Sequence, residues 1–254
     1  MIFYFSGTGN SLHVAEALRE DEKEKIVDIA KVQQKGKYGF HIRKGEAVGL
    51  VCPVYYSGIP KIMLEFIRHV RLKDDYGYIY LVLTHGGGPG GAAYMTWREL
   101  KKRGYHMSAC FDIRMPRNYI FIRDAMDPEE EDQRIRDAEP VICDIREAVI
   151  RRETTPMTFG PGSRLCAWTM YPLCEMYMPV RKFYTDDRCI GCGVCASRCP
   201  EKCIEMIDGR PVWTKKRCIR CMSCLRCNAI QYGNVIKDRR RYRYHAVGEH
   251  AGCS

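Results

Sequence analysis

The feature that most constrains the fold of this chain is the spacing of its cysteines. Nine of the 15 cysteines fall between Cys189 and Cys227, and the first run reads Cys-x2-Cys-x2-Cys-x3-Cys-Pro up to Pro200. A second run with the same initial spacing begins at Cys218. The number of cysteines is odd, and the apolar N-terminal run is too short for the core of a signal peptide. Neither observation fits a secreted disulfide scaffold. The cysteines are therefore expected to bind a metal or an iron–sulfur cluster in a cytoplasmic protein.

The first cysteine run matches the bacterial ferredoxin pattern in full. Three thiolates on one tight loop can reach three irons of a cubane, and the fourth, after a longer step, points to the other cluster. We therefore expect two [4Fe-4S] clusters, one held by Cys189, Cys192, Cys195 and Cys227 and the other by Cys199, Cys218, Cys221 and Cys224. A four-cysteine zinc site is the alternative, but it needs neither the third cysteine nor the Cys-Pro ending.

The second run departs from the pattern at its end. Two residues separate Cys224 from Cys227 where the pattern has three, and Asn228 stands where a proline is expected. The fourth ligand of the first cluster therefore stays open between Cys227, Cys203 and Cys253.

Up to about residue 153, short apolar runs alternate with amphipathic stretches. The expected strands are 1–5, 25–29, 47–52, 78–84 and 107–115, and the expected helices are 12–20, 61–70, 92–103 and 129–153. Pro140 is expected to kink or break the last helix. This alternation predicts an α/β fold with a doubly wound parallel sheet.

A loop rich in glycine and hydroxyl groups follows the first expected strand. It consists of Ser6, Gly7, Thr8, Gly9, Asn10 and Ser11. The glycines let the backbone approach an anion, and the following helix points its N-terminal amides at the same place. The loop contains no Lys or Arg, so a phosphate would be bound by neutral donors. The loop resembles the phosphate loop of flavodoxins, which holds the FMN phosphate, although an ordinary capped turn is the alternative.

Three further loops are expected at the same edge of the sheet, where ligands of doubly wound folds bind. Their candidate flavin-binding residues are Pro53, Val54, Tyr55, Tyr56, Ser57, Gly58, Thr84, His85, Gly86, Gly87 and Asn118. Either Tyr55 or Tyr56 can stack on the isoalloxazine ring. The Ser57–Gly58 peptide is expected to be flexible and to hydrogen-bond the ring.

The combination resembles fused flavodoxin–ferredoxin proteins, often called EFR-type ferrodoxins. The resemblance is carried by residues 3–11, 53–56, 60–61, 115–119, 189–193 and 229–233. It implies electron transfer by FMN and two [4Fe-4S] clusters. The changes in composition along the chain predict a flavodoxin-like domain over 1–153, an apolar linker over 154–184, a small α+β dicluster ferredoxin domain over 185–236 and a basic tail over 237–254.

The formal net charge is +10, and residues 156–254 hold 17 Lys and Arg against 8 Asp and Glu. Cluster thiolates and a flavin phosphate would offset much of this charge. The run Arg239–Arg243 is either a docking patch for an acidic redox partner or a solvated tail. No recognised nucleic-acid motif accompanies it, and no apolar run is long enough to span a membrane.

The expected function is that of an electron carrier, which couples FMN to the clusters and passes low-potential electrons to a partner redox enzyme. The alternative is a flavin-dependent reductase of a small molecule, fed by its own clusters. Apart from His85, no acid–base constellation lies near the flavin loops. The carrier is therefore favoured, and no catalytic residue is assigned. A flavodoxin-like interaction module that binds no flavin is a third reading.

Overall fold

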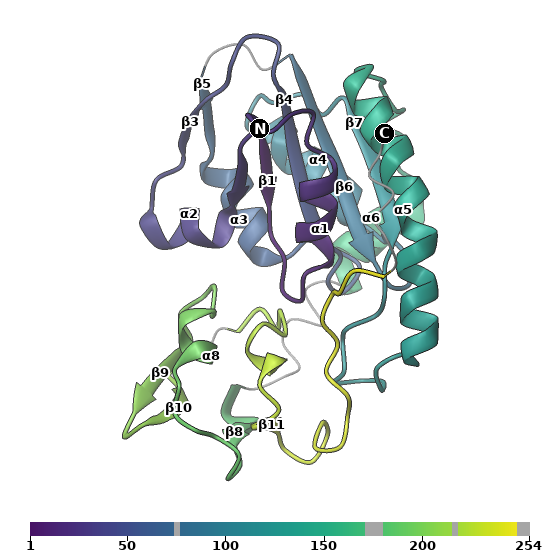
Figure 1. Ribbon diagram of the computed structural model, residues 1–254. Coiled ribbons are helices and arrows are strands. Elements are labelled where there is room, and N and C mark those ends of the chain that lie inside the picture. The colour runs from purple at the N-terminus through teal and green to yellow at the C-terminus, as the bar shows by residue number, and fades with distance from the viewer. Residues whose placement is uncertain (74–76, 171–179, 215–217, 248–254) are drawn as a thin grey trace.

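The computed structural model describes residues 1–73, 77–170, 180–214 and 218–247. A layered N-terminal domain lies above a smaller C-terminal domain in Figure 1. The chain after the small domain, drawn in yellow, returns to the lower end of the N-terminal domain. The chain after the small domain therefore contacts the N-terminal domain again.

A five-stranded parallel sheet forms the centre of the N-terminal domain. Its order is β2-β1-β4-β6-β7, the doubly wound order of flavodoxin-like sheets. The strands are β1 (Ile2–Tyr4), β2 (Ile26–Asp28), β4 (Ala47–Pro53), β6 (Tyr78–His85) and β7 (Ala109–Arg114). All five strands expected from the sequence are present, and the α/β fold class is confirmed.

Helices cover both faces of this sheet, because alternate side chains of each strand point to opposite faces. In β6, Ile79 and Leu81 join one buried cluster, while Tyr80 and Val82 join the other. The first cluster packs against α2 (Ile29–Lys35), α3 (Lys61–His69) and α4 (Ala92–Lys102). The second packs against α1 (Asn10–Ala17) and α5 (Pro128–Ile150).

The expected break at Pro140 is wrong, because α5 continues through it. Pro140 lies on the exposed side of the helix, where water can satisfy the carbonyl that loses its N–H partner. Ala138 and Ile142 hold the helix on the sheet on either side of the proline. Helix α2 and the short parallel pair β3 (Gly39–His41) and β5 (Arg71–Lys73) were not expected from the sequence.

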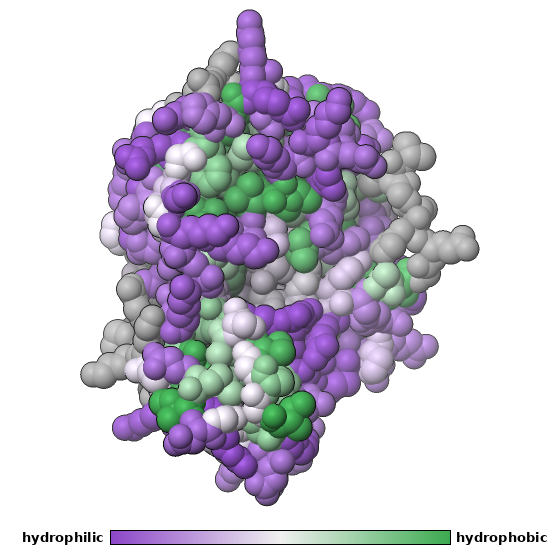
Figure 2. All heavy atoms as spheres, turned by 60° about the vertical axis from the view of Figure 1, so that its left-hand side comes forward, coloured by the Kyte–Doolittle hydropathy of each residue, from purple (hydrophilic) through white to green (hydrophobic). Residues whose placement is uncertain are grey.

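The C-terminal domain contains two antiparallel strand pairs. One joins β8 (Phe183–Thr185) to β11 (Ile230–Tyr232), and the other joins β9 (Ile204–Ile207) to β10 (Arg210–Trp213). Short helices complete it: η2 (Val180–Lys182), α8 (Val194–Ser197) and η3 (Cys224–Arg226). Its small core includes Phe121 from the N-terminal domain, which packs against Phe183 and Tyr232. Apolar side chains also gather on the surface of this lower domain in Figure 2.

The apolar linker is described only in part, since residues 171–179 lie outside the described ranges. Its first half forms α6 (Pro161–Leu165) and the π-helical turn η1 (Cys166–Met170). Both pack on the start of α4, where a Cβ at Gly91 would stand 2.5 Å from the carbonyl oxygen of Ser163. The side chain of Trp168 faces outward, and the residue is 64% exposed. Within the described residues, no helix has the length and apolar character that a membrane crossing requires.

Candidate functional site

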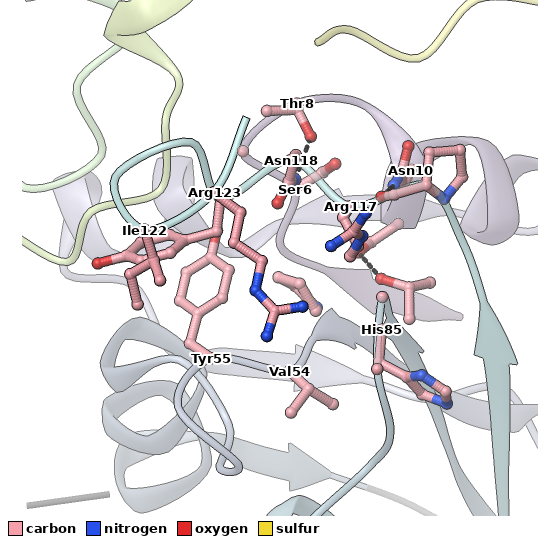
Figure 3. A pocket seen from close by; sticks show the side chains of 18 of the residues that line it. Ser6, Thr8, Asn10, Val54, Tyr55, His85, Arg117, Asn118, Ile122 and Arg123 are labelled. Atoms are coloured by element: carbon pink, nitrogen blue, oxygen red, sulfur yellow. Dashed lines mark hydrogen bonds between the residues drawn. The ribbon is translucent and has the colours of Figure 1, made fainter. Parts of the chain in front are cut away.

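A pocket of about 300 Å³ opens at the carboxyl edge of the parallel sheet (Figure 3). Four loops from the N-terminal domain surround it, as the order of the strands requires. The predicted residues that line it are Ser6, Gly7, Thr8, Asn10, Ser11, Pro53, Val54, Tyr55, Thr84, His85, Gly86, Gly87 and Asn118. The other predicted residues, Gly9, Tyr56, Ser57 and Gly58, do not line it.

Hydrogen bonds within the protein hold the first half of the 6–11 loop. The Gly9 amide donates to Ser6 Oγ at 3.1 Å, and the Asn118 Nδ2 group donates to Thr8 Oγ1 at 2.6 Å. Both hydroxyl oxygens act as acceptors in these bonds. Their own protons therefore remain available to a phosphate.

The second half of the loop is held in the same way. The hydroxyls of Ser11 and Thr84 lie 2.8 Å apart, and Asn10 Nδ2 donates to the carbonyl oxygen of Pro116 at 3.1 Å. One of the two paired hydroxyl protons stays free, as does the second proton of the Asn10 amide. Helix α1 begins at Asn10, so its N-terminal amides add to these donors. The donor set fits a phosphate.

The two predicted tyrosines have different surroundings. Tyr55 lines the pocket, and its buried hydroxyl has no hydrogen-bond partner among the described residues. Burial, together with the nearby Cys221, holds the pKa of Tyr55 well above its usual value. Tyr56 points elsewhere: its hydroxyl bonds to that of Tyr119 and accepts from Arg220 Nη1 at 3.1 Å. Tyr55 is thus the tyrosine that can contact a bound ring.

Both polar groups of the Ser57–Gly58 peptide are hydrogen-bonded within the protein, and the flexibility expected from the sequence stays a prediction. Gly58 exchanges two backbone hydrogen bonds with Tyr55, both of 2.8 Å. The carbonyl oxygen of Ser57 accepts from the Gly91 amide at 2.7 Å. Tyr56 and Ser57, rather than the glycine, take the left-handed conformation, with φ of 52° and 63°. These bonds use the groups that were expected to face the ring.

Two arginines that the sequence did not assign also line the pocket, Arg117 and Arg123. Figure 3 shows the guanidinium of Arg123 reaching in between the pocket walls near Tyr55 and Val54. The stem of Arg117 lies over Gly86, where a Cβ would come within 2.4 Å of Arg117 Cγ. Arg117 lies in a loop that the sequence placed at this edge. Arg123 lies beyond it and carried no sequence signal.

The eight predicted cluster ligands form two groups that differ in burial. The inner quartet consists of Cys199, Cys218, Cys221 and Cys224, and the outer quartet consists of Cys189, Cys192, Cys195 and Cys227. Cys199 and Cys221 of the inner quartet are buried, whereas Cys192 and Cys227 of the outer quartet are exposed. The remaining members of both quartets are half-buried.

The members of each quartet lie close enough to influence one another. After burial, the neighbours Cys227 and Cys189 contribute to raising the pKa of Cys195. For Cys224, burial raises the pKa most, followed by the inner-quartet neighbours Cys221, Cys218 and Cys199. No group of three or more His, Cys, Asp or Glu in the described ranges can hold a single metal ion. A cubane spreads its thiolates over four irons and needs no such group.

Cys203 lies with the inner quartet, not with the outer one. Its amide donates to Cys199 Sγ at 3.2 Å, and a hydrogen bond from its thiol contributes most to lowering the pKa of Cys199 to about 6. A second thiol hydrogen bond from Cys203 reaches Cys218. Cys203 is therefore not placed to replace Cys227 in the outer quartet. Cys253 lies outside the described residues.

The loop of the inner quartet touches the flavodoxin-like pocket directly. A Cβ at Gly7 would stand 1.9 Å from the carbonyl oxygen of Cys221, so only glycine fits there. Cys221 also packs within the buried cluster of the N-terminal domain. Arg220, in the same loop, is buried and bonds to Tyr56 behind the pocket. The two candidate centres therefore share a wall.

The run Arg239–Arg243 is not a solvated tail, and its role as a docking patch stays a prediction. Arg239 pairs with Asp124 at 2.8 Å, and Arg240 pairs with the buried Glu131 at 2.6 Å. Arg241 donates to the Ile230 carbonyl at 3.1 Å. Arg243 donates to the carbonyl oxygen of Arg226. These bonds use the guanidinium groups within the chain, which sequence patterning cannot reveal.

Two family models agree with this arrangement of domains. The flavodoxin domain family matches residues 1–111, and the 4Fe-4S binding domain family matches residues 183–205. No curated protein matches the chain. A solved structure described as the Trp repressor binding protein from Bacillus subtilis is 11% identical, with a TM-score of 0.33, covering 61% of this chain and 99% of that one. The chain is a flavodoxin–ferredoxin fusion, with the flavodoxin domain at its N-terminus and the 4Fe-4S domain after it.

Proposed function

We propose that this protein transfers electrons between FMN and two [4Fe-4S] clusters and passes low-potential electrons to a partner redox enzyme. The observation that carries the proposal is the contact between Gly7 and Cys221, because it joins the flavodoxin pocket to the inner quartet. When bound, FMN supplies both one-electron and two-electron chemistry, and the clusters carry single electrons.

The 6–11 loop is proposed to hold the FMN phosphate. Free hydroxyl protons of Ser6 and Thr8, with the amides at the start of α1, supply neutral donors. Arg117 and Arg123 add positive charge elsewhere on the pocket wall. This charge favours an anionic occupant over a neutral one.

Tyr55 and Val54 are proposed to cover the flavin ring. Both line the pocket, and the unpartnered hydroxyl of Tyr55 can donate a hydrogen bond to a polar group of the ring. Because Tyr55 also lies near Cys221, its side chain excludes water from the space between the two centres.

The quartets are proposed to hold one cluster each. Backbone amides already point at inner-quartet sulfurs: that of Cys203 at Cys199 Sγ, 3.2 Å away, and that of Arg220 at Cys218 Sγ, 3.3 Å away. Such hydrogen bonds stabilise added negative charge and so set the cluster potential. The outer quartet is the proposed contact with the partner enzyme, because two of its cysteines, Cys192 and Cys227, are exposed.

The proposal is tested by the composition of the full chain purified without oxygen. We expect one FMN and about eight irons per chain, with matching acid-labile sulfide. About four irons would limit the protein to one cluster. Zinc in place of iron, or iron without flavin after FMN is added, would contradict the proposal.

A further inference from the structure

The C-terminal arm, residues 237–247, contacts the 6–11 loop although it follows the cluster domain in sequence. The amide of Tyr244 donates to the carbonyl oxygen of Thr8 at 2.9 Å. Its Cβ lies 2.7 Å from the position that a Cβ on Gly9 would take, so the arm and the loop are in close contact. The Tyr244 ring stacks on His13 of α1, with ring centroids 4.3 Å apart.

A second tyrosine of the arm reaches the loop from another direction. The Tyr242 hydroxyl donates to Asn10 Oδ1 at 2.6 Å, and both residues are buried. The amide nitrogen of the same Asn10 side chain donates to Pro116. Asn10 is therefore fixed between the arm on one side and the 116–119 loop on the other. Removal of the Tyr242 hydroxyl would leave a buried carbonyl oxygen without its donor.

Ion pairs anchor the arm close to the pocket. Arg240 pairs with Glu131 at the start of α5, and Arg239 pairs with Asp124, which lines the pocket. The Glu131 side chain is fully buried, and its pKa is raised mainly by that burial, an effect that Arg240 opposes. An arm held at these points packs against the 6–11 loop and is not a loose end.

We propose that Tyr242 and Tyr244 are positioning residues of the flavin phosphate site. The Tyr242 hydroxyl acts through Asn10, and the Tyr244 side chain acts through its packing on Gly9 and His13. Together they hold the 6–11 loop in the conformation that binds phosphate. The inference rests on the proposed binding of FMN. It assigns to the arm a role in recognising the phosphate, while the flavin ring is bound by other loops.

The test compares FMN with riboflavin, which lacks the phosphate. The full chain is freed of flavin with its clusters intact, and both dissociation constants are measured anaerobically for the unaltered protein and for Tyr242→Phe and Tyr244→Gly. We expect each variant to weaken FMN binding about tenfold, the loss that a missing buried hydrogen bond or packing contact gives, while riboflavin binding and iron content stay unchanged. Tyr184→Phe, whose hydroxyl lies on the cluster domain, is the matched control and should change neither.

Unchanged FMN affinity in both variants would overturn the inference. An equal loss for FMN and riboflavin would also overturn it, because the arm would then act on the whole pocket and not on phosphate recognition. If the unaltered protein bound neither flavin, the proposed function itself would fail. Flavin binding by the unaltered protein therefore distinguishes a failure of the inference from a failure of the proposed function.

Discussion

The inner quartet lies against the flavodoxin domain, whereas the outer quartet lies at the surface, although both come from the same repeated spacing. Cys221 is buried within the core of the N-terminal domain, and Cys192 and Cys227 are exposed. The difference arises from what each loop packs against, since Gly7 leaves room for the backbone of Cys221 in the inner loop. Spacing thus predicts the kind of cofactor, while packing brings the inner quartet rather than the outer one against the flavodoxin domain.

The largest expected effect comes from removing one ligand from each quartet, which tests whether the two quartets differ in packing. Cys221→Ala and Cys192→Ala should each lose about four irons. Only Cys221→Ala should also loosen the contact between the domains, because its thiol packs in the N-terminal core. Iron analysis and thermal unfolding under argon measure both effects. Equal unfolding temperatures in the two variants would argue against the difference in packing.

The contact itself is tested by Gly7→Ala. The added Cβ would stand 1.9 Å from the Cys221 carbonyl oxygen, so the domains must shift apart. We expect a loss of about 1–3 kcal/mol in unfolding free energy, typical of an overpacked site, and weaker FMN binding. Gly39→Ala is the matched control, since nothing lies within 4 Å of its added Cβ. A Gly7→Ala variant with unchanged unfolding free energy and FMN binding would show that the domains are not in contact there.

Arg220→Gln tests how a nearby cation affects the reduction potentials of the two clusters. Arg220 is a buried cation beside Tyr56 and the inner quartet, so its loss disfavours the more negative reduced forms. We expect the inner cluster potential to fall by roughly 60 mV, a tenfold change for one electron. Arg188→Gln, an exposed position near Cys227, should shift the outer cluster less because water screens it. A redox titration followed by EPR measures both.

The smallest expected effect concerns pH and the C-terminal arm. A hydrogen bond to Asp132 contributes most to raising the pKa of His245 above its usual 6.5, and Glu131 adds to it. The stabilisation from His245 is therefore complete below about pH 6.5 and is lost as pH rises through the raised pKa. FMN binding should weaken slightly between pH 6 and 9, and less so in His245→Gln. The effect is small because the ring is half-exposed. An identical pH profile in both proteins would show that His245 does not contribute to the pH dependence of FMN binding.

The sequence predicted the parallel sheet because its strands are short, apolar and separated by amphipathic helices. It also predicted the loops at the pocket, since the ends of parallel strands meet at one edge. It did not predict α2, β3 or β5, whose three to seven residues carry little periodicity. The break predicted at Pro140 was wrong because the effect of a proline depends on which face of the helix it occupies.

The sequence could not predict contacts between segments far apart in the chain. Tyr242 meets Asn10 across 232 positions, and Arg220 meets Tyr56 across 164. No local pattern records such pairs, because they depend on how the two domains pack. The basic run 239–243 therefore read as a free surface, whereas its arginines pair within the chain.

The central claim is that the flavin exchanges electrons directly with the inner cluster. The most direct test is the rate at which bound FMN is reduced after the clusters of the full chain are rapidly reduced, in Cys192→Ala and in Cys221→Ala loaded with FMN. We expect Cys192→Ala to keep the fast rate of the unaltered protein and Cys221→Ala to lose it. Fast reduction in Cys221→Ala, with slow reduction in Cys192→Ala, would contradict the account and make the outer cluster the neighbour of the flavin.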